Sequence, residues 1–124
     1  MTATRVLIVD DSPHVRQDLG TLLPLLGDIE VVGEAGNGEQ AIRQAEALHP
    51  DVVLLDLEMP VLDGYEAGRQ IKARCPAIRV IALTAYGNPV ARERARQAGL
   101  DEFVEKGATV AEIVRAIHGL QTED

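Results

Sequence analysis

Short apolar runs alternate with stretches of helical spacing along the whole chain. Between and after the runs, apolar residues recur every three or four positions, which is the spacing of one helix face. Five runs rich in β-branched residues are predicted as strands, at Arg5–Asp10, Ile29–Ala35, Val52–Asp56, Arg79–Leu83 and Glu102–Glu105. Five strands alternating with five helices predict an α/β fold, with a parallel sheet covered by helices on both faces.

The polarity of each run predicts the place of its strand in the sheet. Residues 6–9, 52–55 and 80–83 are continuously apolar, as strands in the middle of a covered sheet require, whereas acidic residues interrupt the runs 29–35 and 102–105. We therefore expect the second and fifth strands at the edges. With right-handed crossovers the economical strand order is 2-1-3-4-5, the flavodoxin-like three-layer sandwich. In that order a ligand crevice opens beyond the carboxyl ends of the first and third strands.

Length and composition describe one ordinary globular domain. The chain has 124 residues, of which 46 % are hydrophobic and 26 % charged. We expect a domain over residues 1–120, followed by a tail or the start of a linker over 121–124. The net charge of −8 argues against binding of nucleic acid or an anionic membrane by this domain. The single Cys75 excludes an intrachain disulfide, and the absence of a signal-peptide or membrane-helix pattern predicts a cytoplasmic protein.

Polar residues gather where four of the predicted strands end. Asp10 and Asp11 lie at the end of the first strand, Asp56 ends the third, Thr84 lies directly after the fourth and Lys106 directly after the fifth. Because neighbouring parallel strands end at one edge of a sheet, these side chains are expected to share one small volume. Three carboxylates packed together raise one another's pKa unless a cation compensates them. The oxygen-only ligand set fits a hard divalent cation, and Mg²⁺ suits a site that accepts a phosphate.

Each of these residues also has a purely structural interpretation. Asp10 and Asp11 can favour the turn into a helix that Ser12 caps, with proline at the first helical position. Thr84 can be a turn residue at a strand end, and Lys106 can be a surface lysine.

Four separate motifs resemble the receiver domain of two-component response regulators. These are VLIVDDSP, VVLLDLEMPVLDG, VIALTA and FVEKGA, which occur in this order and at the right spacing. The resemblance runs over essentially the whole chain, from residue 5 to about residue 120. The stretch IEVVGEAGNGEQAI and the residues around Lys106 resemble NarL/LuxR-type receivers, which usually precede a helix-turn-helix DNA-binding domain. In many receivers a proline follows the lysine of the fifth strand, whereas this chain has Gly107.

The resemblance implies a role for each residue of the cluster. Asp56 would be the phosphoryl acceptor, Thr84 would hydrogen-bond the phosphoryl group, and Lys106 would pair with it. Mg²⁺ would be held by three acidic side chains and one backbone carbonyl, from Asp10, Asp11, Asp56 and Glu58.

The resemblance also implies which residues change conformation on phosphorylation and which residues affect the lifetime of the phosphorylated state. Thr84 and Phe103 would change position together on phosphorylation, and the face formed by the fourth helix, fifth strand and fifth helix would change shape. The alternative is that Phe103 is a fixed core residue of an edge strand. Glu58 and Tyr86 occupy positions that modulate the lifetime of the acyl phosphate in this family, so we expect their substitution to alter that lifetime without abolishing phosphorylation.

The function implied is a phosphorylation-activated signalling switch, loaded by a sensor histidine kinase. Phosphorylation is expected to favour a homodimer and to control transcription through a DNA-binding domain. The chemistry would be self-directed phosphoryl transfer and autodephosphorylation, not that of a conventional enzyme. One alternative is a stand-alone receiver that acts by protein–protein contacts, and another is a pseudo-receiver used only for docking. A Mg²⁺-dependent aspartyl phosphatase of the haloacid dehalogenase type would need Asp-x-Asp after the first strand, where this chain has adjacent Asp10 and Asp11.

Overall fold

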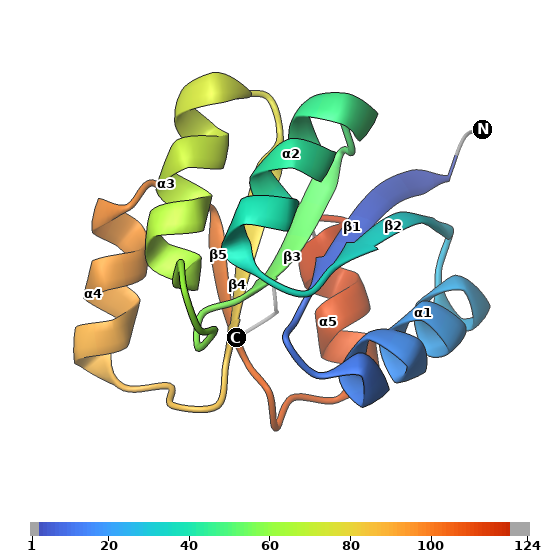
Figure 1. The fold of residues 1–124 in the computed structure, drawn as a ribbon. Coiled ribbons are helices and arrows are strands. Elements are labelled where there is room, and N and C mark those ends of the chain that lie inside the picture. The colour runs from blue at the N-terminus through green and yellow to red at the C-terminus, as the bar shows by residue number, and fades with distance from the viewer. Residues whose placement is uncertain (1–2, 120–124) are drawn as a thin grey trace.

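The computed structural model describes residues 3–119 and contains one five-stranded parallel sheet (Figure 1). Its strands lie in the order β2-β1-β3-β4-β5. They are β1 (Thr4–Val9), β2 (Ile29–Ala35), β3 (Val52–Asp56), β4 (Arg79–Thr84) and β5 (Glu102–Glu105). The predicted order is confirmed, including the two edge strands. The first strand begins and ends one residue earlier than expected, and the fourth extends one residue further.

Five helices alternate with the strands, as the apolar spacing predicts. They are α1 (Pro13–Leu26), α2 (Gly38–Leu48), α3 (Gly64–Arg74), α4 (Pro89–Gln97) and α5 (Val110–Ile117). Each begins after a residue whose side chain accepts a hydrogen bond from a backbone N–H of the first turn, at Ser12, Asn37, Asp63, Asn88 and Thr109. These caps satisfy donors that a helix start leaves without a partner.

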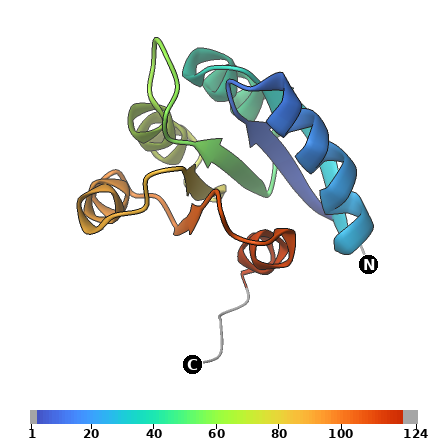
Figure 2. The ribbon, with the colours of Figure 1, turned by 90° about the horizontal axis from the view of Figure 1, so that it is seen from below.

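The helices form two layers, one on each face of the sheet (Figure 2). Leu7, Val53 and Leu55 pack into a cluster with α2 and α3, while Ile8 and Leu54 pack into a second cluster with α1 and α5. This division follows from the two-residue period of a strand, which sends successive side chains to opposite faces. A third, smaller cluster joins α4 to the face that α2 and α3 cover. The central strands are thereby buried on both sides.

The predicted end of the domain at residue 120 and the predicted tail at 121–124 lie outside the described residues. Within residues 3–119, no helix is both long enough and apolar enough to span a membrane.

Candidate functional site

The strand register brings the predicted site residues to one edge of the sheet. Val9 of β1 lies opposite Leu55 of β3, so Asp10, which follows Val9, is a neighbour of Asp56. On the other side of β3, Thr84 of β4 lies opposite Glu105 of β5. The next residue, Lys106, is fixed by a backbone hydrogen bond of 2.7 Å from its N–H to the Thr84 carbonyl.

Three carboxylates meet at this edge. Oxygens of Asp10, Asp11 and Asp56 all lie within 4.8 Å of one another. Asp10 and Asp56 are buried, with 1 % and 0 % of their surface exposed, whereas Asp11 is exposed. The backbone N–H of Ser12 donates to Asp10 Oδ1 at 2.9 Å, and that of Glu58 donates to Asp56 Oδ1 at 3.0 Å. These bonds fix the buried carboxylates but satisfy only part of their charge.

Lys106 supplies the positive charge of the site. Its Nζ lies 3.2 Å from Asp56 Oδ1 and 3.3 Å from Asp10 Oδ2. Partial burial opposes the charged form of Lys106, but the two carboxylates outweigh it and raise its pKa above the ordinary value. One ammonium group therefore faces two buried carboxylates.

The remaining negative charge is poorly compensated by the protein. Within the described residues, Asp56 Oδ2 is buried and accepts no hydrogen bond, while the buried Asp10 Oδ2 faces the Lys106 ammonium at 3.3 Å. Burial and the charge of Asp10 raise the pKa of Asp56 from 3.8 to about 6, against the opposing effects of the Glu58 N–H and Lys106. A buried anionic oxygen without a partner is costly. The cluster therefore fits a hard cation with a preference for oxygen ligands.

Thr84 makes a contact that the sequence did not reveal. Its hydroxyl, fully buried, donates to Oε2 of the Glu58 side chain and accepts a hydrogen bond of 3.0 Å from the Tyr86 N–H. The neighbouring Ala85 N–H donates to Glu58 Oε1 at 3.0 Å. The Glu58 side chain thus links the ends of β3 and β4. The sequence predicted that the Glu58 backbone carbonyl would bind Mg²⁺ and that the side chain would affect the lifetime of the acyl phosphate. No sequence motif indicates this bridge.

The predicted switch residue lies between β5 and α4. Phe103 is half-buried and packs against the small cluster formed by Leu57, Ala82 and Ala95. The guanidinium carbon of Arg92 lies 4.7 Å from the centre of its ring, within the range of a cation–π contact. Phe103 of β5 therefore contacts both apolar side chains and the Arg92 guanidinium.

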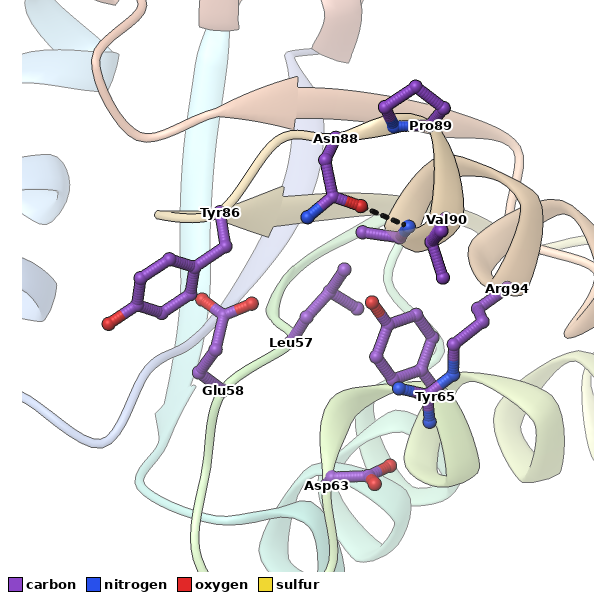
Figure 3. Close-up of a pocket in the computed structure, with 10 residues that line it drawn as sticks. Leu57, Glu58, Asp63, Tyr65, Tyr86, Asn88, Pro89, Val90 and Arg94 are labelled. Atoms are coloured by element: carbon purple, nitrogen blue, oxygen red, sulfur yellow. Dashed lines mark hydrogen bonds between the residues drawn. The ribbon is translucent and has the colours of Figure 1, made fainter.

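A cavity of about 550 Å³ lies between the segments that follow β3 and β4 and the helices α3 and α4 (Figure 3). Glu58 and Tyr86 line one side of it, and Tyr86 is largely exposed. Across the cavity, the Arg94 guanidinium stacks on Tyr65, with 3.9 Å between its carbon and the ring centre. Burial, more than the opposing charge of Arg94, raises the pKa of Tyr65. The cavity extends from Glu58, two residues after Asp56, to the start of α4.

Comparison with known proteins finds similarity to response regulators. The family described as response regulator receiver domain matches residues 6–118. The response regulator GacA of Pseudomonas viridiflava is 41 % identical over 113 residues, which cover 91 % of this chain and 53 % of GacA. The response regulator VraR of Staphylococcus aureus is 41 % identical over 113 residues, 91 % of this chain and 54 % of VraR. The chain spans about half the length of these relatives.

Solved structures extend the similarity to the fold. The receiver domain of the response regulator NarL from Mycobacterium tuberculosis matches with a TM-score of 0.91 and 34 % identity, covering 96 % of each chain. A LuxR-family DNA-binding response regulator from Staphylococcus aureus matches with a TM-score of 0.88 and 33 % identity, covering 94 % of this chain and 97 % of that one. With a matching family over nearly its whole length and the same strand order and helix layers, this chain belongs to the response regulator receiver domain family.

Proposed function

We propose that this chain is a phosphorylation-activated signalling switch in which Asp56 accepts a phosphoryl group from a sensor histidine kinase. The observation that carries the proposal is the buried Asp56 carboxylate at the end of central strand β3, between Asp10 and Lys106 and with one oxygen lacking a hydrogen-bond donor. Membership of the receiver family supports the same assignment.

The proposed reaction is a displacement at phosphorus. A carboxylate oxygen of Asp56 attacks the phosphorus of a phosphohistidine, and the P–N bond breaks with its electron pair going to the imidazole nitrogen, which takes a proton. The product is an acyl phosphate on Asp56. In the hydrolysis step, water attacks phosphorus, the P–O bond returns its electron pair to the Asp56 carboxylate, and the protons of water go to phosphate and solvent. The chemistry is thus confined to the chain's own aspartate.

The surrounding residues would stabilise the charge that moves. Lys106, 3.2 Å from Asp56 Oδ1, would neutralise charge on the transferring group, and the Thr84 hydroxyl would donate to one of its oxygens. A pKa of about 6 leaves Asp56 mostly ionised, and therefore nucleophilic, at neutral pH. Mg²⁺ would be held by the side chains of Asp10, Asp11 and Asp56 and by the Glu58 carbonyl, and it supplies positive charge to the phosphoryl oxygens.

The proposed output is a change in the face formed by α4, β5 and α5. Thr84 would move toward the phosphoryl group, and Phe103 would turn inward toward the volume beside β4. The changed face would favour a homodimer. Because the chain covers about half of its relatives, and one similar structure is a LuxR-family DNA-binding response regulator, we place transcription control in a domain outside this sequence. In this proposal residues 1–120 are the receiver, and residues 121–124 are a tail or the start of a linker.

Glu58 and Tyr86 would set the lifetime of the phosphorylated state. Both lie at the mouth of the cavity beside the site (Figure 3), where a water molecule attacking phosphorus would approach. The phosphatase alternative lacks support, because Asp10 and Asp11 are adjacent and the family match assigns the chain elsewhere.

Intact-mass measurement after incubation with acetyl phosphate and Mg²⁺ tests the proposal. We expect a mass gain of one phosphoryl group, which Asp56→Asn abolishes. Asp18→Asn, the same change at an exposed position of α1, is the matched control and should retain the gain. No modification of the parent chain would leave only a docking module, and turnover of external phosphate esters would favour a phosphatase. Either result overturns the proposal.

A further inference from the structure

The Glu58 carboxylate bridges two donors at the end of β4. Oε2 accepts the Thr84 hydroxyl, and Oε1 accepts the Ala85 N–H at 3.0 Å. Glu58 itself follows β3, and its backbone N–H donates to Asp56 Oδ1 at 3.0 Å. The half-buried side chain therefore extends from the strand that carries the phosphoryl acceptor to the strand that carries its hydrogen-bond donor.

While the Glu58 carboxylate accepts these two hydrogen bonds, neither the Thr84 hydroxyl nor the Ala85 N–H can donate to another group. A threonine hydroxyl has one proton and a backbone amide has one, and both are directed at Glu58. The Thr84 oxygen also accepts the Tyr86 N–H at 3.0 Å, which fixes the orientation of the hydroxyl. A phosphoryl group on Asp56 would need donors for its anionic oxygens, and the Thr84 hydroxyl is the donor that the proposed function assigns to it.

We infer that the Glu58 carboxylate is a latch that occupies the phosphoryl-binding donors Thr84 and Ala85 in the unphosphorylated protein and must be displaced when Asp56 is phosphorylated. The inference rests on the proposed function. Two anionic groups cannot share the same two donors, because like charges repel and each donor proton is used once. The latch holds residues 84–86 in one position and releases them when the phosphoryl group takes the donors.

The adjoining cavity can receive the displaced side chain. Glu58 lines the cavity of about 550 Å³ together with Tyr65 and Arg94 (Figure 3). Within residues 3–119, Arg94 forms no ion pair with a carboxylate, and its guanidinium lies on the far side of the cavity from Glu58. When the Glu58 carboxylate leaves the Thr84 and Ala85 donors, it can therefore enter this cavity, whose opposite side carries the positively charged Arg94.

The latch should lower the apparent affinity for a phosphoryl group, since only the open fraction of molecules can bind it. Titration with beryllium fluoride in Mg²⁺, an analogue of the phosphoryl group, measures this affinity. We expect Glu58→Ala to bind about tenfold more tightly than the parent chain. The backbone carbonyl at position 58 is kept in this variant. Glu58→Gln has the same size and retains one acceptor oxygen, so its affinity should lie between the two.

A second readout needs neither metal nor phosphoryl analogue. In Mg²⁺-free buffer, the Ala85 amide proton of the parent chain is bonded to a carboxylate, and we expect its exchange with solvent to be about tenfold faster in Glu58→Ala. Glu105→Ala is the matched control, because it removes an exposed glutamate opposite Thr84 without touching either donor. It should leave both measurements close to the parent values.

The outcomes separate the latch from the proposed function. Equal affinities in the parent chain and Glu58→Ala, an equal gain in Glu105→Ala, or unchanged Ala85 exchange would overturn the latch while phosphorylation of Asp56 stands. A parent chain that binds no beryllium fluoride and gains no phosphoryl group from acetyl phosphate would overturn both.

Discussion

At the scale of single residues, the role proposed for Asp56 imposes two requirements that oppose each other. A nucleophile must be ionised at neutral pH, and yet full burial at the end of β3 disfavours the ionised form. Burial first, and the charge of Asp10 second, raise the pKa of Asp56 to about 6. The metal-free protein therefore loses stability by keeping this carboxylate ready for reaction.

Asp56→Asn should raise the free energy of unfolding in Mg²⁺-free buffer at pH 7.5. A folded-state pKa above the unfolded value means that the native state binds the extra proton between about pH 4 and 6, so this group's contribution to stability falls as pH rises through that range. At about 1.4 kcal/mol per pKa unit, the gain at pH 7.5 should be about 1–3 kcal/mol.

Urea unfolding of both proteins between pH 4 and 8 measures this difference. The gain should shrink as pH falls from 8 toward 4, because the folded-state carboxyl becomes protonated, and it should vanish only below the unfolded-state pKa of 3.8. An Asp56→Asn protein that is less stable at pH 7.5, or a difference independent of pH, would contradict the assignment of the cost to this carboxyl group.

At the scale of elements, the close contact between the start of α3 and the end of β3 positions the site. The Gly64 N–H donates to the Leu57 carbonyl at 3.1 Å, and the Asp63 side chain caps α3. A Cβ at position 64 would lie 2.3 Å from the Asp56 carbonyl oxygen and 2.6 Å from the Leu57 Cα. These are backbone atoms, so relief requires movement of the strand end that carries Asp56.

Gly64→Ala should therefore destabilise the protein by about 2–4 kcal/mol, as overpacking against rigid backbone does. Gly20→Ala is the matched control, because a Cβ at this position in α1 meets no atom within 4 Å. It should instead stabilise by about 0.5–1 kcal/mol through helix propensity. Denaturant unfolding compares the two variants, and a Gly64→Ala protein as stable as the parent would refute the role given to this contact.

At the scale of the whole molecule, the proposed Mg²⁺ site joins the ends of the two neighbouring central strands β1 and β3. Asp10 directly follows β1, and Asp56 is the last residue of β3. Without a cation, the buried Asp56 Oδ2 accepts no hydrogen bond, and Asp10 Oδ2 faces the Lys106 ammonium at 3.3 Å. A ligand that binds only the folded state stabilises it by mass action.

Mg²⁺ at about ten times its dissociation constant should raise Tm by roughly 3–6 °C, since it adds about 1.4 kcal/mol to stability. Asp11→Asn should remove most of this rise while changing the metal-free Tm little, because Asp11 is exposed. Thermal melts with NaCl at matched ionic strength provide the control. An equal rise with NaCl, or a full Mg²⁺ response in Asp11→Asn, would argue against the site.

The sequence by itself determined the sheet order and the convergence of the site residues. The apolar runs 6–9, 52–55 and 80–83 marked the central strands, and the acids in 29–35 and 102–105 marked the edges. Because the carboxyl ends of parallel strands meet at one edge, the gathering of Asp10, Asp56 and Lys106 followed from their positions at strand ends. These features follow from the local pattern of apolar and polar residues together with general rules of sheet topology, so they can be predicted from the sequence.

Only the tertiary structure decided the contacts between side chains on different elements. The bridge from Glu58 to Thr84 and Ala85, the stacking of Arg92 on Phe103 and the close approach at Gly64 each join segments whose separation in the chain carries no periodic signal. The direction of the half-buried Glu58 side chain depends on which donors the neighbouring strand presents. The sequence therefore determined where the proposed phosphoryl acceptor Asp56 lies, and the packing of β3 against β4 decided that Glu58 accepts the hydrogen bonds of Thr84 and Ala85.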